Sequence, residues 1–481
     1  MTYIFNYDIK ETMTSVRESQ SYTPPINGSD DVSRALYANS PRVWEKSPDY
    51  TEFDRASSLG RITHVYHALR SNGDVSRREL DAKYEDTIGF FNGAFDAYES
   101  KRTDDLSDVG RVFVVPMRIT REREEYASEV LPFAPLLDPK FGVNADIRQK
   151  TVVGLPPCIL DSYTASDESD RRGALVLAPI FGDMERDTVT HTGLRRQYQR
   201  VKLARLVARN INLTAKFSSE VLGAKVMGLG AIIPAVTKFG TTIKNPEITT
   251  TTGHGGTVDL ILQTAKKSFE SLGGTAQGVG VIGGAGSIGY STLDVVRDSL
   301  PDQRVITYDK NTDRLRQLVD DREDSREISV VDGVSVLLMD ADVIIAAVTT
   351  PIDLDVVDPG SELDLRGKII IDDSQPGSFN REQVEARGGR LVWVVGNDSS
   401  EDGFLQRTHG YTYGTEAGLY GSHAVWGCEA EAAVIAASGE YDKAIQERVT
   451  PRHARQIGEL CARYSVTTAP FQSYGNPVSL S

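Results

Sequence analysis

The sequence has few cysteines, no long apolar run and a shortage of basic residues. Its three cysteines lie far apart without a CxxC pair, which argues against a disulfide framework and a cysteine-based zinc site. No apolar segment approaches the roughly 20 residues of a membrane-spanning helix. The 53 lysines and arginines are outnumbered by 68 aspartates and glutamates, and the net charge of −15 disfavours general binding to nucleic acids or anionic membranes. The first residues lack the basic and apolar regions of a signal peptide, so we expect a soluble, cytoplasmic protein.

A glycine-rich turn within residues 278–296 is the most informative stretch. GVGVIGGAGSIGYSTLDVV has the order strand, turn, helix, and its glycines match the pattern GxGxxG. Such a turn binds a nucleotide pyrophosphate because glycines let backbone N–H groups approach it and the helix N-terminus adds partial positive charge. The residues expected to contact the cofactor here are Gly283, Gly284, Gly286, Ser287, Ile288 and Gly289.

An acidic residue follows at the expected distance. The apolar stretch RVITYD ends on Asp309, twenty residues after Gly289. In dinucleotide-binding domains an acid at this spacing hydrogen-bonds the adenosine ribose, so strand, turn, helix and acid together predict a Rossmann domain. The Asp309 carboxylate would repel a 2′-phosphate, which favours NAD slightly. Lys310 would accommodate that phosphate, so NADP stays open.

Two later strands open onto polar residues. DVIIAAV leads to Thr349 and Thr350, where the nicotinamide would lie. GKIIIDDSQPGSF, residues 367–379, opens onto Asp372, Asp373 and Ser374. Because strands alternate with helices, we predict an α/β protein with a Rossmann doubly wound parallel sheet, a preceding α/β substrate domain and C-terminal helices.

The length of 481 residues predicts two or three domains, and 40% hydrophobic with 25% charged residues is ordinary for globular proteins. We expect an N-terminal region of uncertain role at 1–165 and a substrate domain at 166–260. The Rossmann domain is expected at 261–400, and helices that close the crevice at 401–481. In the last part, Thr450 and Pro451 have the pattern of a helix cap and first helical position.

An aromatic stripe and a basic helix stand out in the first half. The stripe recurs at helical spacing and predicts a core-facing helix surface; it consists of Tyr84, Ile88, Phe91, Phe95 and Tyr98. In the helix predicted near residues 193–217, positive charges gather beside an apolar stripe; they include Arg195, Arg196, Arg200, Lys202 and Arg205. They indicate either a solvated face paired with local carboxylates or a surface for an acidic partner, such as a carrier protein.

The segment TTGHGGT, residues 251–257, leads into a helix that ends just before the glycine-rich strand. A polar turn of this kind places hydroxyls and a helix N-terminus beside the nicotinamide. Thr252 and His254 are therefore candidate catalytic residues, although at least one threonine is expected to be only a helix cap.

Several segments together resemble the acyl-[acyl carrier protein] reductases that form fatty aldehydes. GLGAIIPAV, TTGHGGT, GGAGSIG, ADVIIAAVTTP, IIIDDSQPGSF and the tail from HAVWGCEAEA occur in the family's order, over roughly residues 170–475. The resemblance implies reduction of an acyl thioester, on carrier protein or coenzyme A, to an aldehyde by a nicotinamide cofactor. It implies the phosphorylated cofactor, and it places Cys428 on a cysteine of the family's C-terminal helix.

One departure from the family matters. The resemblance places a nucleophilic cysteine, which forms an acyl-enzyme, at the start of the strand KIIIDDSQPG, where this sequence has Lys368. An amine there would form an amide too stable to reduce. The covalent mechanism is therefore not supported at this position.

Three functions stay open from the sequence. The first is an acyl-thioester reductase, acting by direct hydride transfer with the TTGHGGT turn as oxyanion donor, or through Cys428 as nucleophile. The second is an NAD-dependent dehydrogenase of a small alcohol, amine or aldehyde, with His254 or His423 transferring the proton. The third is a nucleotide-binding sensor or scaffold without chemistry. No metal site is predicted, and the sequence leaves a homo-oligomer open.

Overall fold

The computed structural model forms two compact units, which hold most of residues 1–250 and most of residues 251–481. The residues it describes are 32, 36, 53–73, 75–100, 106, 108–117, 131, 133–137, 141, 143–163, 168–182, 193–273, 276, 278–322, 328–348, 350–360, 362–374, 377–401, 403–407, 423–473 and 476–479. For residues 135, 145 and 193–200 it describes the backbone alone. The four parts expected from the sequence are a finer division than these two units, and that division stays a prediction.

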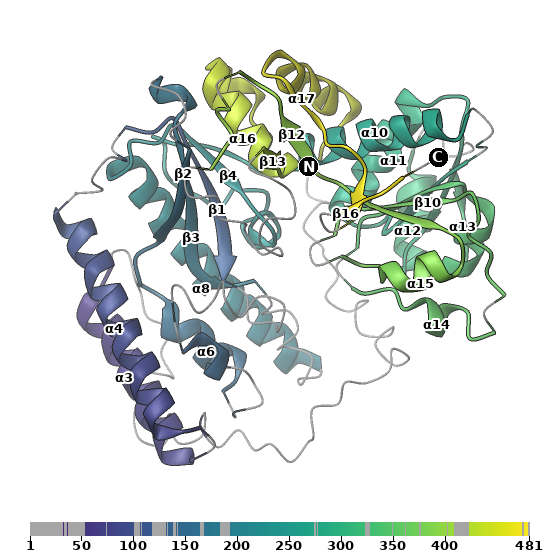
Figure 1. Ribbon diagram of the computed structural model, residues 1–481. Helices are drawn as coiled ribbons and strands as arrows, with labels where there is room; N and C mark the ends of the chain where they lie inside the picture. Colours follow the sequence, from purple (N-terminus) through teal and green to yellow (C-terminus); the bar gives the residue numbers. More distant parts are fainter. Residues whose placement is uncertain are drawn as a thin grey trace. The chain divides into compact units, whose positions relative to one another are not determined.

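The first unit is built on a five-stranded sheet (Figure 1). Its strands are β1 (Arg111–Met117), β2 (Cys158–Tyr163), β3 (Gly173–Phe181), β4 (Val226–Leu229) and β5 (Thr249–Thr251). They lie in the order β2-β3-β1-β4-β5, with β1 parallel to both β3 and β4, and β2 antiparallel to β3. All residues of β1 and β3 are buried, as expected for strands covered on both faces.

The helices of the first unit are α3 (Arg55–Asn72), α4 (Arg77–Ser100), α6 (Ala145–Val152), α8 (Gly193–Glu220) and the short α9 (Ile233–Val236). Val112 and Val114 of β1 share a core with Val207 and Ile211 of α8. The aromatic stripe of α4 is confirmed as packing surface. Its residue Phe91 is fully buried, and other members of the stripe pack against rings outside α4.

The second unit contains a six-stranded, fully parallel sheet (Figure 1). Its strands are β6 (Gly278–Ile282), β7 (Arg304–Tyr308), β8 (Ile328–Val330), β9 (Val343–Ala346), β10 (Ile369–Asp372) and β11 (Arg390–Trp393). The spatial order is β11-β10-β9-β6-β7-β8. Numbered from β6, this is the order 3-2-1-4-5-6 of the Rossmann fold, with its switch point between β6 and β9. The predicted fold class is confirmed.

Helices cover both faces of this sheet. The helices are α10 (His254–Ser271), α11 (Ser287–Ser299), α12 (Thr312–Asp320), α13 (Val334–Asp340), α14 (Leu354–Val357), α15 (Arg381–Ala386), α16 (Gly427–Ser438) and α17 (Pro451–Arg463). On one face, Val281 and Ile345 share a core with Ile261 of α10 and Leu293 of α11. On the other face, alternate strand residues such as Ile344 pack with α13, α14 and α15. Successive residues of a strand point to opposite faces of the sheet, so each strand contributes to two separate hydrophobic cores.

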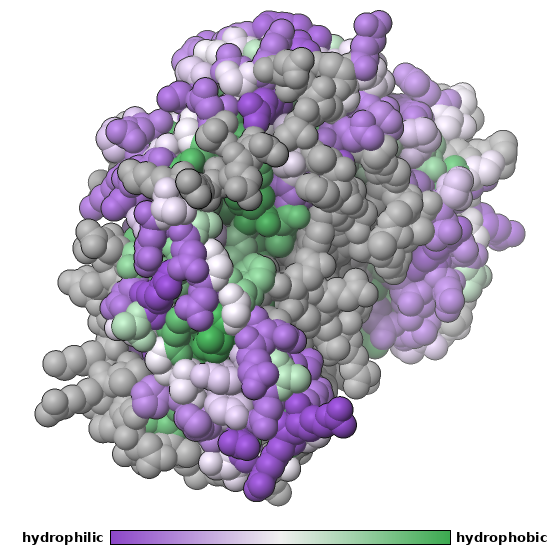
Figure 2. Space-filling model, turned by 60° about the vertical axis from the view of Figure 1, so that its left-hand side comes forward, coloured by the Kyte–Doolittle hydropathy of each residue, from purple (hydrophilic) through white to green (hydrophobic). Residues whose placement is uncertain are grey.

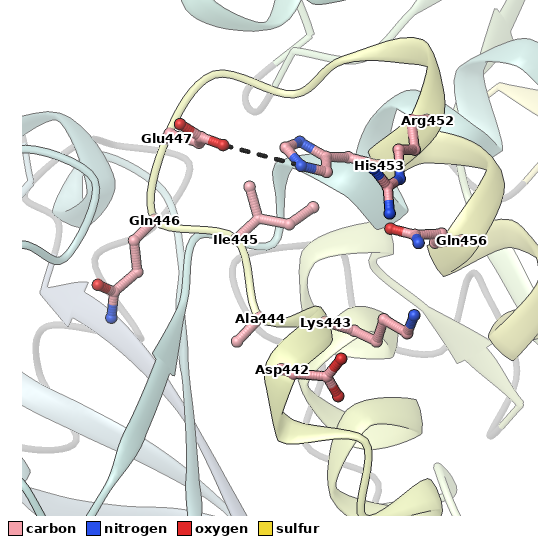
Figure 3. Close-up of a pocket in the computed structure, with 9 residues that line it drawn as sticks. All are labelled: Asp442, Lys443, Ala444, Ile445, Gln446, Glu447, Arg452, His453 and Gln456. Atoms are coloured by element: carbon pink, nitrogen blue, oxygen red, sulfur yellow. Dashed lines mark ion pairs between the residues drawn. The ribbon is translucent and has the colours of Figure 1, made fainter.

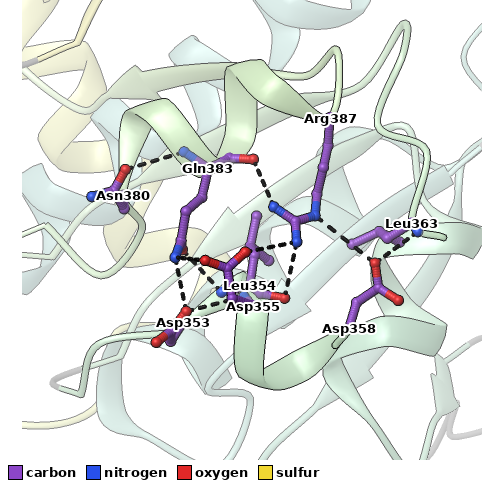
Figure 4. Close-up of polar contacts among 8 residues, drawn as sticks. All are labelled: Asp353, Leu354, Asp355, Asp358, Leu363, Asn380, Gln383 and Arg387. Carbon is purple, nitrogen blue, oxygen red and sulfur yellow. Dashed lines mark hydrogen bonds and ion pairs between the residues drawn. The ribbon is translucent and has the colours of Figure 1, made fainter. Parts of the chain in front are cut away.

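The connections that follow β9 and β10 are joined by a polar network (Figure 4). Gln383 of α15 donates to Asp353 at 2.8 Å and to Asp355 at 3.0 Å, and accepts from the Leu354 N–H at 3.0 Å. Arg387 of the same segment donates to Asp355 at 2.9 Å. These bonds hold the short helix α14 against α15, and so fix the two segments relative to each other.

The C-terminal helices α16 and α17 pack against α10 within the second unit. The predicted start of α17 is confirmed, because the Thr450 side chain accepts from the His453 N–H at 3.3 Å and Pro451 is the first helical residue. Small strands complete the unit: β12 (Gly396–Asp398), β13 (Ala424–Val425), β14 (Val466–Thr468), β15 (Gln472–Ser473) and β16 (Asn476–Pro477).

Hydrophilic residues make up most of the described surface on the face shown in Figure 2, with smaller apolar areas between them. In the part of the chain that the structure describes, few large hydrophobic side chains are exposed: Phe90, Val201, Val336, Met339, Val356 and Tyr441. Within the described ranges, no helix combines the length and apolarity needed to cross a bilayer.

Candidate functional site

The glycine turn connects β6 to α11 at the switch point of the sheet. Gly283 has φ +91°, which favours glycine, and its N–H donates to the Tyr308 carbonyl at 2.8 Å. A Cβ at Gly283 would collide with the Ala347 carbonyl, and one at Gly284 with the Thr307 hydroxyl. At Gly289 a Cβ would collide with the carbonyl of Gly283. These glycines therefore bring the turn, the helix and the neighbouring strands into close contact.

Gly286 differs from the other glycines of the turn because it is exposed. A Cβ on Gly286 would have two backbone oxygens within 4 Å: the carbonyl oxygen of Gly283 at 3.1 Å and that of Ala347 at 3.9 Å. Apart from these two oxygens, the space around Gly286 is open. Gly286 lies at the N-terminus of the 13-residue helix α11. Ser287 and Ile288, the first helical residues, are partly exposed beside it. This is the geometry that lets backbone N–H groups approach an anionic group.

Asp309 lies directly after β7 and faces the turn. Its carboxylate accepts from the Ala285 N–H at 3.1 Å and from the Asn311 N–H at 2.9 Å. Lys310 is exposed. After β9, Thr350 is exposed, and Thr349 lies outside the described residues. The sequence thus identified residues that the structure brings to one edge of the sheet.

The TTGHGGT turn is held by a residue that sequence analysis missed. Glu431 of α16 is completely buried and accepts hydrogen bonds from the Thr251 hydroxyl, from the Gly253 N–H at 3.2 Å and from the Gly256 N–H at 2.8 Å. Burial raises the pKa of Glu431, and these hydrogen bonds oppose that shift. The available signal was a glutamate within the alanine-rich stretch GCEAEAAVIAA. A buried carboxylate in such a helix requires donors from a neighbouring element.

Thr252 lies one residue before Gly253, the N-cap of α10. It is fully buried, its N–H donates to the Ile445 carbonyl at 2.9 Å, and its hydroxyl accepts from the His254 N–H at 3.3 Å. The N-cap of α10 is Gly253 and has no side-chain cap hydrogen bond, so the expectation that one of the threonines is the helix cap is wrong. Catalysis by Thr252 stays a prediction.

His254 joins the TTGHGGT turn to the glycine turn. Its Nδ1 lies 3.4 Å from the hydroxyl of Ser287, the first residue of α11. Burial lowers the pKa of His254 to about 4, so the imidazole is neutral at neutral pH. His423 is exposed, and its carbonyl accepts from the Asp398 N–H at 2.9 Å. A role of either histidine in proton transfer stays a prediction.

Cys428 lies against the start of α10. A Cβ on Gly253 would lie 2.5 Å from the Cys428 Cα, so only glycine allows this contact. Burial strongly raises the pKa of the Cys428 thiol, and the carboxylates of Glu429, Asp373 and Glu431 raise it further. The thiolate that a covalent mechanism needs is therefore disfavoured.

Lys368 lies at the amino end of β10, opposite the edge that carries the glycine turn. Its ammonium group donates to the carbonyls of Met339 at 2.8 Å and Ala341 at 2.6 Å. These bonds give Lys368 a structural role.

The basic helix α8 belongs to the first unit. Lys202 does not contribute to a free basic surface, because its ammonium lies 3.2 Å from Asp146, a carboxylate that also pairs with the fully buried Lys150 at 2.9 Å. Burial lowers the pKa of Lys150 to about 8. Arg205 is exposed. The side chains of the three remaining arginines lie outside the described residues; they are Arg195, Arg196 and Arg200.

A polar cavity of about 480 Å³ lies between the segment 442–447 and the start of α17 (Figure 3). Among the residues that line it, Glu447 and His453 point toward each other, with 3.7 Å between the Glu447 carboxylate and the imidazole Nε2. Ile445 connects this wall to the TTGHGGT turn, because its N–H donates to the Thr251 hydroxyl at 3.0 Å.

No protein-family model matches the chain, and no curated protein sequence matches it. Among solved structures, L-tryptophan dehydrogenase from Nostoc punctiforme is 12% identical, with a TM-score of 0.29, over 74% of this chain and 88% of that one. Shikimate dehydrogenase from Aquifex aeolicus is also 12% identical, with a TM-score of 0.28, over 73% and 97%. The imine reductase BcSIRED from Bacillus cereus BAG3X2 is 21% identical, with a TM-score of 0.19, over 26% and 44%; the chain thus spans less than half of that protein. At such TM-scores these likenesses do not bear on activity, and the fold assignment rests on the strand order of the second unit.

Proposed function

We propose that this protein is an NAD(P)-dependent oxidoreductase that reduces a carbonyl-level substrate. The observation that carries the proposal is the open glycine turn at Gly286, placed at the switch point between β6 and β9, with Asp309 after β7. In a Rossmann fold a dinucleotide binds across this edge, with its pyrophosphate at the turn and its adenosine ribose at the acid. When bound, the reduced nicotinamide would supply a hydride.

The cofactor is proposed to be NAD rather than NADP. The Asp309 carboxylate is oriented by two backbone N–H groups at the ribose position, where it would repel a 2′-phosphate. We expect the wild type to bind NADH at least tenfold more tightly than NADPH, and Asp309→Ser to remove most of that difference. Fluorescence titration with both cofactors measures it, with Asp302→Asn, an exposed substitution before β7, as the control.

Our first choice of substrate is an acyl thioester on carrier protein or coenzyme A, which is reduced to an aldehyde. The support is the family resemblance. Because burial disfavours the Cys428 thiolate, we favour direct hydride transfer over an acyl-enzyme. The test is oxidation of NADH and NADPH with acyl-coenzyme A and acyl-carrier thioesters, with trapping of the aldehyde. Release of free thiol together with aldehyde supports this choice, and retained turnover in Cys428→Ala supports the direct route.

The second candidate is a dehydrogenase of a small alcohol, amine or aldehyde. It is favoured by the structural role of Lys368 and the raised pKa of Cys428, which leave no activated nucleophile at either position. Binding of NADH without thioester turnover, together with oxidation or reduction of a small substrate, supports this alternative.

A carrier protein would contact the basic helix α8. Of the basic residues predicted to bind a carrier, Arg205 is the one whose side chain the structure describes as exposed. If a carrier docks there, Arg205→Glu together with Arg196→Glu and Arg200→Glu lowers turnover of carrier-bound substrate and spares the coenzyme A substrate. An equal loss for both substrates argues against docking.

A further inference from the structure

The carboxyl end of β10 carries an acid to which the proposed function has given no role. Asp373 directly follows β10, and its N–H donates to the Ala346 carbonyl at the end of β9, at 3.1 Å. In this strand order the nicotinamide half of a dinucleotide lies over β9, β10 and β11. With a strand spacing of about 4.8 Å, β10 lies roughly 10 Å from β6 and its turn. Asp373 is therefore on the nicotinamide side of the proposed cofactor.

The two neighbouring acids differ in their hydrogen bonds. Asp372 is fully buried and accepts from the N–H groups of Ser374 at 2.9 Å, Ser378 at 2.6 Å and Phe379 at 3.0 Å, so it organises the loop. Asp373 is partly exposed, and no donor in the described part of the chain hydrogen-bonds its carboxyl group. The Ser374 hydroxyl beside it is buried and also lacks a partner among the described residues. The Asp373 carboxyl group at this strand end is thus available to a ligand, with the buried Ser374 hydroxyl beside it.

The surroundings of Asp373 favour its protonated form. Burial, followed by the charge of Asp372, holds the pKa of Asp373 well above its usual range. The titratable groups that bear on it are Asp372 on its own strand and Cys428 on α16. The Cys428 thiol is uncharged, because burial raises its pKa. Neither group stabilises the carboxylate.

The TTGHGGT turn does not offer its backbone donors to a substrate. The N–H groups of Gly253 and Gly256 bind Glu431, that of Thr252 binds the Ile445 carbonyl, and that of His254 binds the Thr252 hydroxyl. The backbone N–H groups of this turn are thus engaged within the protein, and an oxyanion donor from its hydroxyls stays a prediction. Gly253 of this turn packs against Cys428, and the charge of Asp373 raises the pKa of the Cys428 thiol.

We infer that Asp373 donates the proton to the substrate oxygen or imine nitrogen during hydride transfer, an inference that rests on the proposed oxidoreductase function. As the hydride bonds to the carbonyl carbon, the π electrons move to the oxygen, which takes the proton from the Asp373 carboxyl group. The carbonyl carbon is reduced and the nicotinamide is oxidised. The resulting Asp373 carboxylate regains a proton from solvent at its partly exposed edge.

The test compares Asp373→Asn and Asp373→Glu with the wild type and with the exposed control Asp302→Asn. Turnover is measured as NADH oxidation with octanoyl-coenzyme A and with octanal, over a range of pH. We expect Asp373→Asn to lower kcat/KM by about 10²- to 10⁴-fold and to abolish the fall in activity toward alkaline pH. NADH affinity should be unchanged, and Asp373→Glu should recover part of the activity. Turnover of Asp373→Asn within threefold of the wild type, or an unchanged pH profile, overturns the inference.

Infrared difference spectra give a readout that does not depend on turnover. We expect a protonated carboxyl band in the wild type and in Asp302→Asn that is missing in Asp373→Asn and shifts when NADH is added. The inference fails if that band persists in Asp373→Asn, or if the band does not shift although NADH binds. This readout requires no turnover of a substrate. If the wild type binds neither NADH nor NADPH, the proposed function fails instead.

Discussion

Replacing Glu431 with alanine tests whether α16 holds the turn at the start of α10. The substitution removes the acceptor of one buried hydroxyl and two N–H groups, those of Thr251, Gly253 and Gly256. An unsatisfied buried donor costs about 1–3 kcal/mol, and the three losses are not additive. We therefore expect the free energy of unfolding of the second unit to fall by about 3–5 kcal/mol. Glu431→Gln keeps an acceptor oxygen and should lose only about 1–2 kcal/mol.

The measurement is urea unfolding combined with amide hydrogen exchange of residues 251–262. Exchange localises the effect, because a chain with two units need not unfold in one step. The turn should exchange faster in Glu431→Ala than in Glu431→Gln, and NADH should bind more weakly. A loss below about 1 kcal/mol, or equal damage by both substitutions, would refute the role given to these hydrogen bonds.

Three further substitutions test the packing of the glycine turn, cofactor binding at it, and the effect of a buried acid on stability. Gly289→Ala forces a Cβ onto the Gly283 carbonyl and should destabilise the second unit by about 1–3 kcal/mol in urea unfolding. Gly286→Ala brings a Cβ to 3.1 Å from the same carbonyl oxygen, against 2.1 Å for Gly289→Ala, and should change unfolding by no more than about 1 kcal/mol, yet weaken NADH binding at least tenfold in a titration; the reverse pattern would contradict the site. Burial raises the pKa of Asp259 to about 6. Between about pH 4 and pH 6 the folded state therefore binds more protons than the unfolded state, so the free energy of unfolding falls as the pH rises through that window. Asp259→Asn should flatten this fall and add about 1–3 kcal/mol at pH above 6, measured by urea unfolding across pH; an unchanged slope would show that Asp259 is not its source.

The sheet edge at which we propose cofactor binding was predictable because its signals are local. The strand, the glycine turn and Asp309 lie within about 30 residues, and the spacing of a βαβ unit fixes where they meet. The aromatic stripe of α4 was predictable for the same reason, since helical periodicity alone identifies a packing face.

The partners of the TTGHGGT turn were not predictable, because they come from distant parts of the chain. Nothing near Thr251 indicates that Glu431 and Ile445 bind it. The same limit applies to Lys202, because its position on a basic helix does not indicate that its ammonium group pairs with Asp146. Periodicity assigns a residue to a face, but the opposing side chain depends on tertiary packing.

The hydrogen bonds between Glu431 and the start of α10 have a consequence for the order of folding during synthesis. The bonded residues are 175 to 180 positions apart in the chain. At about 5–20 residues per second, translation needs roughly 9–36 s to bring Glu431 out after the turn has been made. Until then the N–H groups of Gly253 and Gly256 lack their carboxylate. We therefore expect a nascent chain that ends before α16 to leave the turn unprotected, even when every strand of the parallel sheet is present.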